Sequence, residues 1–350
     1  MARIASVSTA VPERFLTVDD TVEHALGVFG AKTRGQEHIE QIIRRCEIDK
    51  RHFAIPVEDI VKPRSLTDTS ALYREHAMRL AMRVVPDALA KAGMEPGDID
   101  HIVTVSCTGI LIPSLDALLM NALPFRADCR RTPITELGCA AGAVGLTRAA
   151  EHIRSRPGEN VLVIAVELSS LTFQRTDGSL TNLVASVLFA DGAAAAVITG
   201  EPGGSGPRIV DSRSHLFRDT EHIMGFELQD GGLHIKLDRE LAPLLERELA
   251  PALDELLVPH RMTSNDLSFF VLHPGGRRLL EVMEDKMGID RRATKASWDV
   301  LREYGNMSSA TVLFVLEQTL RSPSPPPGAY GLLAAFGPGF SSEMLLLQWS

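Results

Sequence analysis

The chain alternates short, almost wholly apolar runs with longer segments of helical period. Apolar runs at residues 4–9, 101–106, 160–167 and 269–273 predict strands that are buried on both faces. Residues 69–93 carry apolar side chains every three or four positions and end at a glycine, which predicts a helix with a glycine C-cap. Such strands alternating with helices are typical of a mostly parallel sheet covered on both sides. We therefore expect an α/β protein.

The weaker patterns complete this alternation of strands and helices. In chain order they predict a helix at 18–48, a strand at 131–137, two strands interrupted by a glycine at 188–199, helices at 276–287 and 310–320, and a strand pair at 330–349.

A turn-rich stretch, EPGGSGP at 201–207, divides the chain into two halves, which we place at residues 1–203 and 204–350. The second half ends in LLAAFGPGFSSEMLLLQW, which has the same plan as LFADGAAAAVITG near the end of the first half. In both, a strand is followed by a glycine-rich break and a further strand. This repetition predicts duplicated halves in a five-layered α/β/α/β/α arrangement.

Composition narrows the class of protein and its partners. The 350 residues are 45% hydrophobic and 23% charged, which is typical of a globular enzyme with a large core. A net charge of −9 argues against nucleic acid as the main partner. The chain has no apolar run of about 18 residues and no apolar N-terminal signal segment. We therefore expect a cytoplasmic protein without stable membrane insertion.

One basic cluster stands out against the acidic background: Arg44, Arg45, Lys50 and Arg51. A solvated surface is the commoner role of such a cluster. The alternative is that it holds the phosphates of a substrate such as coenzyme A.

The candidate nucleophile is Cys139, in TELGCAAGAVGLTRAA, where a strand is expected to give way to a helix. Free N–H groups and the helix dipole stabilise a thiolate at a helix start, so we expect its pKa to fall from about 8.5 toward neutrality. A small buried structural cysteine is the alternative. The four cysteines form no C-x-x-C pair, so neither a disulfide framework nor a metal site is indicated.

Two further residues suit the same chemistry. His273 ends the apolar strand FFVLH before Pro-Gly-Gly, and Asn306 lies in a glycine-containing turn ahead of a helix. A thiolate, an imidazole and an amide suit nucleophilic catalysis with an oxyanion donor, although a buried histidine and a helix cap are the alternatives. Papain-type hydrolases use the same residue types, so the trio alone does not fix the reaction.

A metal site at His215, Asp219 and His222 would lack a fourth ligand, and we expect none.

Five short motifs in this chain together resemble those of a known protein family. They are GCAAG at Gly138, LFADGAAA at Leu188, HPGG at His273, YGNMSSA at Tyr304 and FGPG at Phe336, the last containing Gly337 and Pro338. Their order and separations resemble those of type III polyketide synthases, the chalcone and stilbene synthase superfamily, over nearly the whole chain. The resemblance implies the thiolase fold, a homodimer, and a catalytic triad of Cys139, His273 and Asn306.

The resemblance also implies the reaction. Cys139 accepts an acyl group from acyl-CoA, and His273 and Asn306 stabilise the enolate formed when malonyl-CoA loses CO₂. The enolate then attacks the bound acyl group. Coenzyme A thioesters are the substrates, and no metal or organic cofactor is implied.

The resemblance also implies which residues of this chain line the cavity, because they lie in matching motifs. Phe189 is similar to a gatekeeper phenylalanine, while Ile235 stands where plant chalcone synthases have a second aromatic gatekeeper. Thr172, Ser308 and Cys107 match cavity positions, the last one a position that can influence cyclisation; ordinary packing is the alternative for each.

The run from residue 167 to 192 is most similar to bacterial alkylpyrone and alkylresorcinol synthases. We therefore expect a medium-to-long fatty acyl starter and a pyrone or resorcinol product. Three alternatives stay open: a ketoacyl-ACP synthase III, whose histidine motif reads H-Q-A-N rather than HPGG, a cysteine-dependent acyl-CoA hydrolase, and a non-catalytic acyl-CoA-binding protein.

Overall fold

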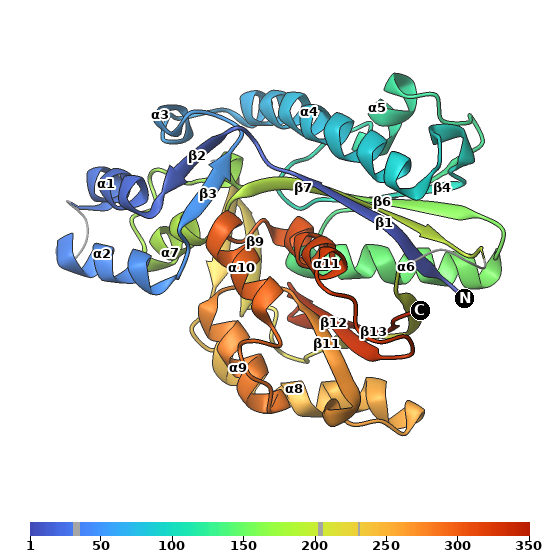
Figure 1. Ribbon diagram of the computed structural model, residues 1–350. Helices are drawn as coiled ribbons and strands as arrows, with labels where there is room; N and C mark the ends of the chain where they lie inside the picture. The colour runs from blue at the N-terminus through green and yellow to red at the C-terminus, as the bar shows by residue number, and fades with distance from the viewer. Residues whose placement is uncertain (31–35, 202–205, 230–231) are drawn as a thin grey trace.

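In the computed structural model, which describes residues 1–30, 36–201, 206–229 and 232–350, two sheets lie one above the other with helices between and outside them (Figure 1). The sheet of the first half has the strand order β1-β7-β6-β4-β5. Its strands are β1 (Arg3–Ala10), β4 (His101–Val105), β5 (Arg130–Ile134), β6 (Asn160–Leu168) and β7 (Asp191–Thr199).

The sheet of the second half has the order β11-β12-β13-β8. Its strands are β8 (Arg208–Leu216), β11 (Leu267–Leu272), β12 (Tyr330–Gly337) and β13 (Ser341–Gln348). A β1–β8 pairing at Arg3 and Arg208 joins this sheet to the first. The predicted boundary at residue 203 lies outside the described residues.

Strand directions differ from the expectation of a mostly parallel sheet. β4 pairs in parallel with β5 and β6, and β11 pairs in parallel with β12. The pairs β6–β7, β1–β7, β12–β13 and β8–β13 are antiparallel. The prediction was wrong because buried apolar strands carry no signal of direction. The short link between β12 and β13 permits only an antiparallel pair.

Helices α6 (Ala141–Ser155) and α11 (Thr311–Arg321) form the middle layer. α6 contacts β4, β6 and β7 on one side and β12 and β13 on the other, and α11 contacts β1, β7, β11 and β12. α4 (Leu66–Ala92) covers the outer face of the first sheet and α8 (Leu241–Leu257) that of the second. This confirms the five-layered α/β/α/β/α arrangement, because the strands are apolar on both faces and most of α6 and α11 is buried between them.

The remaining elements surround these layers. The helices are α1 (Val18–Phe29), α2 (Gln36–Arg45), α3 (Val57–Ile60), α5 (Leu115–Ala122), α7 (Leu180–Leu188), α9 (Arg277–Met287) and α10 (Lys295–Tyr304). Two small sheets pair β2 (Arg14–Thr17) with β3 (Lys50–Phe53), and β9 (Met224–Gln229) with β10 (Gly232–Leu237).

Several predicted boundaries need correction. The expected helix at 18–48 is two helices, α1 and α2. Residues 188–199 contain the end of α7 and one strand, β7, whereas the helix expected at 310–320 is confirmed as α11. The helix expected at 69–93 is confirmed as α4, with Gly93 as a left-handed cap at φ 68°. Boundaries fail where the apolar pattern continues across a turn.

Candidate active site

Cys139 lies in a single turn of 3-10 helix, Gly138–Ala140, directly ahead of α6. Gly138 has φ 49°, a conformation that favours glycine, and a Cβ there would lie 2.6 Å from Cδ of Pro338. A Cβ on Gly337 would lie 2.4 Å from the Leu137 carbonyl oxygen. The GCAAG and FGPG motifs therefore pack against each other, and this close approach fixes the position of the nucleophile.

Asn306 connects the three predicted catalytic segments. Its Oδ1 lies 4.0 Å from Sγ of Cys139 and accepts a hydrogen bond from the Ser308 N–H at 2.8 Å. Its Nδ2 donates to the Gly275 carbonyl at 3.1 Å, in the HPGG loop. Because Oδ1 is held by a backbone donor, Nδ2 is oriented toward that loop and keeps a second N–H for a substrate oxygen.

His273 follows β11 and is held there by its own N–H, which donates to the Ala334 carbonyl at 2.8 Å. The side chain is 2% exposed, and neither ring nitrogen has a hydrogen-bond partner among the residues that the structure describes. A Cβ on Gly275 would lie 3.7 Å from its Nε2, so glycine leaves the ring open on that side. Such unpaired buried nitrogens are costly in a purely structural histidine.

Burial determines the protonation states of Cys139 and His273. It raises the pKa of Cys139 to about 11, although the Ser308 and Asn306 side chains oppose the shift, and it lowers the pKa of His273 to about 3. The expected fall in the pKa of Cys139 is therefore wrong here, because burial of the thiol raises its pKa. At neutral pH the site holds a thiol and a neutral imidazole.

A hydrogen-bonded network lies behind the nucleophile. The Ser308 hydroxyl is 3.6 Å from Sγ of Cys139 and 3.3 Å from Sγ of Cys107. Glu167, fully buried, accepts from the Cys107 N–H at 3.1 Å, from Thr108 Oγ1 at 2.7 Å, and from Ser309 Oγ. Glu167 is not among the site residues predicted from the sequence. A charged residue at the end of the apolar run NVLVIAVE could have indicated that Glu167 has a role in the site.

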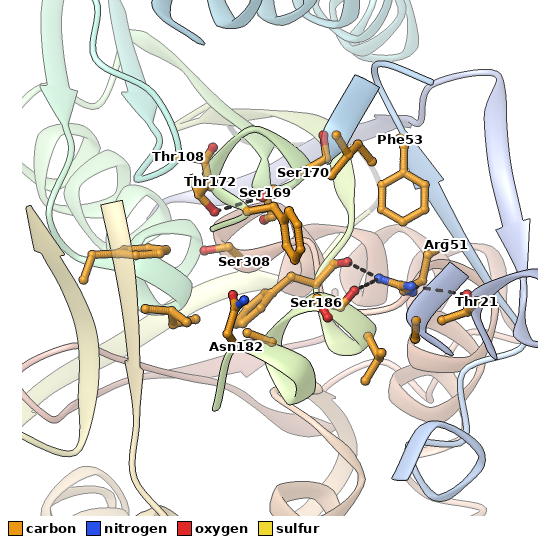
Figure 2. A pocket seen from close by; sticks show the side chains of 18 of the residues that line it. Thr21, Arg51, Phe53, Thr108, Ser169, Ser170, Thr172, Asn182, Ser186 and Ser308 are labelled. Atoms are coloured by element: carbon orange, nitrogen blue, oxygen red, sulfur yellow. Dashed lines mark hydrogen bonds between the residues drawn. The ribbon is translucent and has the colours of Figure 1, made fainter. Parts of the chain in front are cut away.

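One cavity brings most of the predicted residues together (Figure 2). Its empty space, including its mouth, is about 1110 Å³. The predicted residues that line it with Cys139 are Arg51, Cys107, Thr172, Phe189, Ile235, Ser308 and Pro338. Gly337 packs instead against the turn that carries Cys139.

The structure does not support the predicted phosphate contact of Arg51. The side chain is 3% exposed, and its Nη1 donates to the carbonyl oxygens of Ser186 and Phe189. Burial lowers its pKa to about 10, so it stays protonated at neutral pH. Lys50 is half-buried, with Nζ 3.8 Å from Glu303 and 5.3 Å from the centre of the Phe15 ring.

Within the described ranges there is no group of three metal-ligating side chains placed to hold an ion. His215 makes a 3.1 Å contact with Glu255 instead. No helix among the described residues is both long and apolar enough to cross a membrane.

Two family models cover almost all of the chain. The model for the chalcone and stilbene synthases, N-terminal domain, matches residues 1–202, and the model for their C-terminal domain matches residues 208–349. The chain belongs to the chalcone and stilbene synthase family. It is a type III polyketide synthase with a thiolase fold, a transferase that works by decarboxylative condensation with malonyl-CoA.

Named relatives span the full length of this synthase. The 1,3,6,8-tetrahydroxynaphthalene synthase of Streptomyces peucetius subsp. caesius is 35% identical, over 99% of this chain and 93% of its own length. The phloroglucinol synthase of Pseudomonas fluorescens is 30% identical, over 97% of each chain. Family membership favours the synthase over the three alternatives that the motifs left open.

Solved structures agree with this assignment. The crystal structure of the 1,3,6,8-tetrahydroxynaphthalene synthase from Streptomyces coelicolor matches with a TM-score of 0.96 and 36% identity over 99% of both chains. PKS-I from the brown alga Ectocarpus siliculosus matches with a TM-score of 0.92 and 28% identity, over 100% of this chain and 98% of its own.

Proposed function

We propose that this synthase loads a medium-to-long fatty acyl group from acyl-CoA onto Cys139, extends it with malonyl-CoA and cyclises the product to a pyrone or a resorcinol. The observation that carries the proposal is an apolar wall of the cavity. Side chains from α1, β2, β3 and α3 form that wall: Leu16, Ala25, Val28, Phe29, Phe53, Val57, Ile60 and Val61. An alkyl chain would bury its surface there.

The triad residues take distinct roles in the proposed reaction. The Cys139 thiol attacks the thioester carbonyl, and a free nitrogen of His273 accepts its proton and passes it to the coenzyme A sulfur. The acyl group is thereby transferred to Cys139, and coenzyme A leaves as a thiol. When malonyl-CoA then loses CO₂, the second N–H of Asn306 Nδ2 donates to the enolate oxygen, together with His273. The enolate carbon attacks the acyl thioester and displaces the Cys139 sulfur. The extended chain is then a coenzyme A thioester, and its transfer back to Cys139 permits the next round.

A malonyl-derived starter is the second candidate. Two relatives are named as synthases of tetrahydroxynaphthalene and phloroglucinol, which are compact aromatic products. The polar groups beside Cys139, among them Cys107 and Ser308, would suit a starter that carries oxygen atoms. The two candidates differ in which part of the cavity the starter fills.

Coenzyme A phosphates require exposed basic side chains. With Arg51 buried, we propose Lys50 and the exposed Arg44 and Arg45 for this contact, which is supported by their clustering in an otherwise acidic chain. The proposed enzyme needs no metal or organic cofactor.

We also propose a homodimer. The loop between β4 and α5 exposes two large apolar side chains, Ile110 and Ile112, and the latter is 95% exposed. Apolar side chains that protrude together from a surface are typical of a contact site. A cytoplasmic location is proposed as well, since all four cysteines are free thiols.

Steady-state kinetics with hexanoyl-, dodecanoyl- and palmitoyl-CoA, and with malonyl-CoA alone, test the starter. Each buried CH₂ contributes about 0.8 kcal/mol, so we expect kcat/KM to rise by up to about fourfold per carbon until the apolar wall is covered. Ile235→Phe should shift the optimum to shorter chains, whereas Ile235→Leu, which conserves volume, should not. A wild-type optimum with malonyl-CoA alone would establish the second candidate instead.

A further inference from the structure

Arg51 is a charged side chain sealed inside the protein at the wall of the cavity. It extends from β3, and Nη1 donates to the carbonyl oxygens of Ser186 at 2.6 Å and Phe189 at 2.9 Å. Nη2 lies 3.3 Å from Oγ1 of Thr21 on α1. Figure 2 shows the guanidinium between Ser186 on one side and Thr21 on the other. A buried cation with directed bonds of this kind fixes the groups around it.

The two carbonyl groups belong to the C-terminal end of α7, where a helix leaves its last carbonyls without partners. If α7 continued, the Ser186 carbonyl would accept from the N–H of Ala190. That N–H instead donates to the Asn306 carbonyl at 2.9 Å. Arg51 satisfies the carbonyl that is released, and its positive charge matches the negative end of the helix dipole. Arg51 therefore stabilises the point at which α7 stops.

The same junction holds the backbone of Asn306. The Asn306 N–H donates to the Leu188 carbonyl at 3.0 Å, so residue 306 is bonded to the chain on both sides of Phe189. The stem of Arg51 packs beside the preceding residue, because a Cβ on Gly305 would lie 2.9 Å from its Cγ. Arg51 thus contacts both segments of this short bridge.

The chain after Phe189 is also held by β3, the strand that carries Arg51. Asp191 accepts hydrogen bonds from the Ala54 N–H and the Ser170 N–H, each at 2.8 Å. Ala54 directly follows β3, so Arg51 and Ala54 hold the segment at both ends of Phe189. A shift of β3 or loss of the guanidinium would move the Phe189 ring and the Asn306 amide together.

We propose that Arg51 is a positioning residue for the condensation reaction, which places the Phe189 ring in the cavity and the Asn306 amide against the enolate through one buried guanidinium. The proposal rests on the role proposed above for Asn306. It predicts that loss of Arg51 affects malonyl-CoA decarboxylation and product length more than starter loading.

Three variants distinguish the contribution of the Arg51 guanidinium from that of the aliphatic part of its side chain. Arg51→Met removes the charge and keeps the packing against Gly305, Arg51→Lys keeps a charge, and Arg51→Ala leaves space for added methylguanidinium. Starter loading is measured as the acyl-enzyme mass, and malonyl-CoA decarboxylation as CO₂ release per loaded site. We expect Arg51→Met to lower decarboxylation about 100-fold, the effect of a misplacement near 1 Å, and to lower loading less than about threefold. Arg51→Lys should restore part of the rate, and so should methylguanidinium with Arg51→Ala.

Arg3→Ala is the matched control, because Arg3 is also buried and donates to a backbone carbonyl, that of Gly206 at 3.4 Å, but does not line the cavity. It should keep the wild-type ratio of decarboxylation to loading. A wild-type ratio and unchanged product lengths in Arg51→Met would overturn the proposal, as would an equal change in Arg3→Ala. If Arg51→Ala does not fold, Arg51→Met and Arg51→Lys still decide.

Asn306→Ala distinguishes this proposal from the proposed function. If that variant decarboxylates malonyl-CoA as fast as the wild type, the role of Asn306 fails, whatever the Arg51 variants show. If it loses decarboxylation while Arg51→Met does not, only the positioning role fails.

Discussion

Cys139 and His273 are both buried, and among the described residues neither side chain has an ion-pair partner that would hold a charge on it. Because only the thiolate is nucleophilic, alkylation of Cys139 should follow its raised pKa of about 11. We expect the rate of alkylation by iodoacetamide to rise about tenfold per pH unit between about pH 7 and 9. The measurement is the rate of mass gain at Cys139, with Cys139→Ala as the blank for the other three cysteines.

The same alkylation measurement on His273→Gln tests whether His273 contributes a charge to the site. A neutral imidazole contributes no charge to the thiolate, so the variant should show the same pH profile. A rate that is already constant above pH 7 in the wild type and rises with pH only in His273→Gln would reveal a thiolate and imidazolium pair, and would contradict the neutral site.

The residue types of the site could be predicted from the sequence, because a nucleophile, an imidazole and an amide each sit in a motif with its own glycine. Their environment could not. The pKa of Cys139 depends on how completely the second half of the chain covers it, and no local pattern encodes that burial. Arg51 was misassigned for the same reason, since a basic cluster gives no sign of which member points inward.

Gly142 marks the closest approach between the middle-layer helix α6 and the turn after Asn306. A Cβ at this position would lie 2.1 Å from the Ser309 carbonyl oxygen, which is backbone and cannot swing away. We expect Gly142→Ala to lower the free energy of unfolding by about 1–3 kcal/mol and to reduce kcat by moving Cys139 away from Ser308. Urea unfolding and steady-state kinetics measure the two effects.

Gly27 offers the control on another helix. It lies within α1, and a Cβ there has no atom within 4 Å. Gly27→Ala should raise the free energy of unfolding by about 0.5–1 kcal/mol, because alanine favours a helix over glycine. Equal stability losses in both variants would show that close packing at Gly142 is not the cause.

At the scale of elements, the long patterned segments were predictable and the junctions were not. The helix ending at Gly93 was correct because its pattern and its cap agree. The end of α7 was missed because LVASVLFADGAAAAVIT is apolar or small apart from Ser186, Asp191 and its final threonine, so neither period 2 nor period 3.6 stands out. That junction carries Phe189, whose position depends on contacts from residues far away in the chain.

At the scale of the whole molecule, the proposed homodimer can be tested on the exposed loop after β4. Ile112→Asp places a charge where an apolar contact is proposed, so we expect the dimer to dissociate at micromolar concentration in sedimentation velocity experiments. Val258→Asp is the control, since Val258 is 63% exposed at the end of α8, away from this loop. A monomeric wild type, or equal dissociation of both variants, would contradict the assignment of the interface.

The position of α6 and α11 between two sheets has a consequence for the order in which the molecule opens. Amide hydrogens in the buried parts of these helices can exchange with solvent only after one sheet separates from the other, since these parts are covered on both sides. The outer helices α4 and α8 can fray without that event. The helix that begins beside Cys139 is therefore among the last parts to become accessible, and the nucleophile keeps its setting until the two halves come apart.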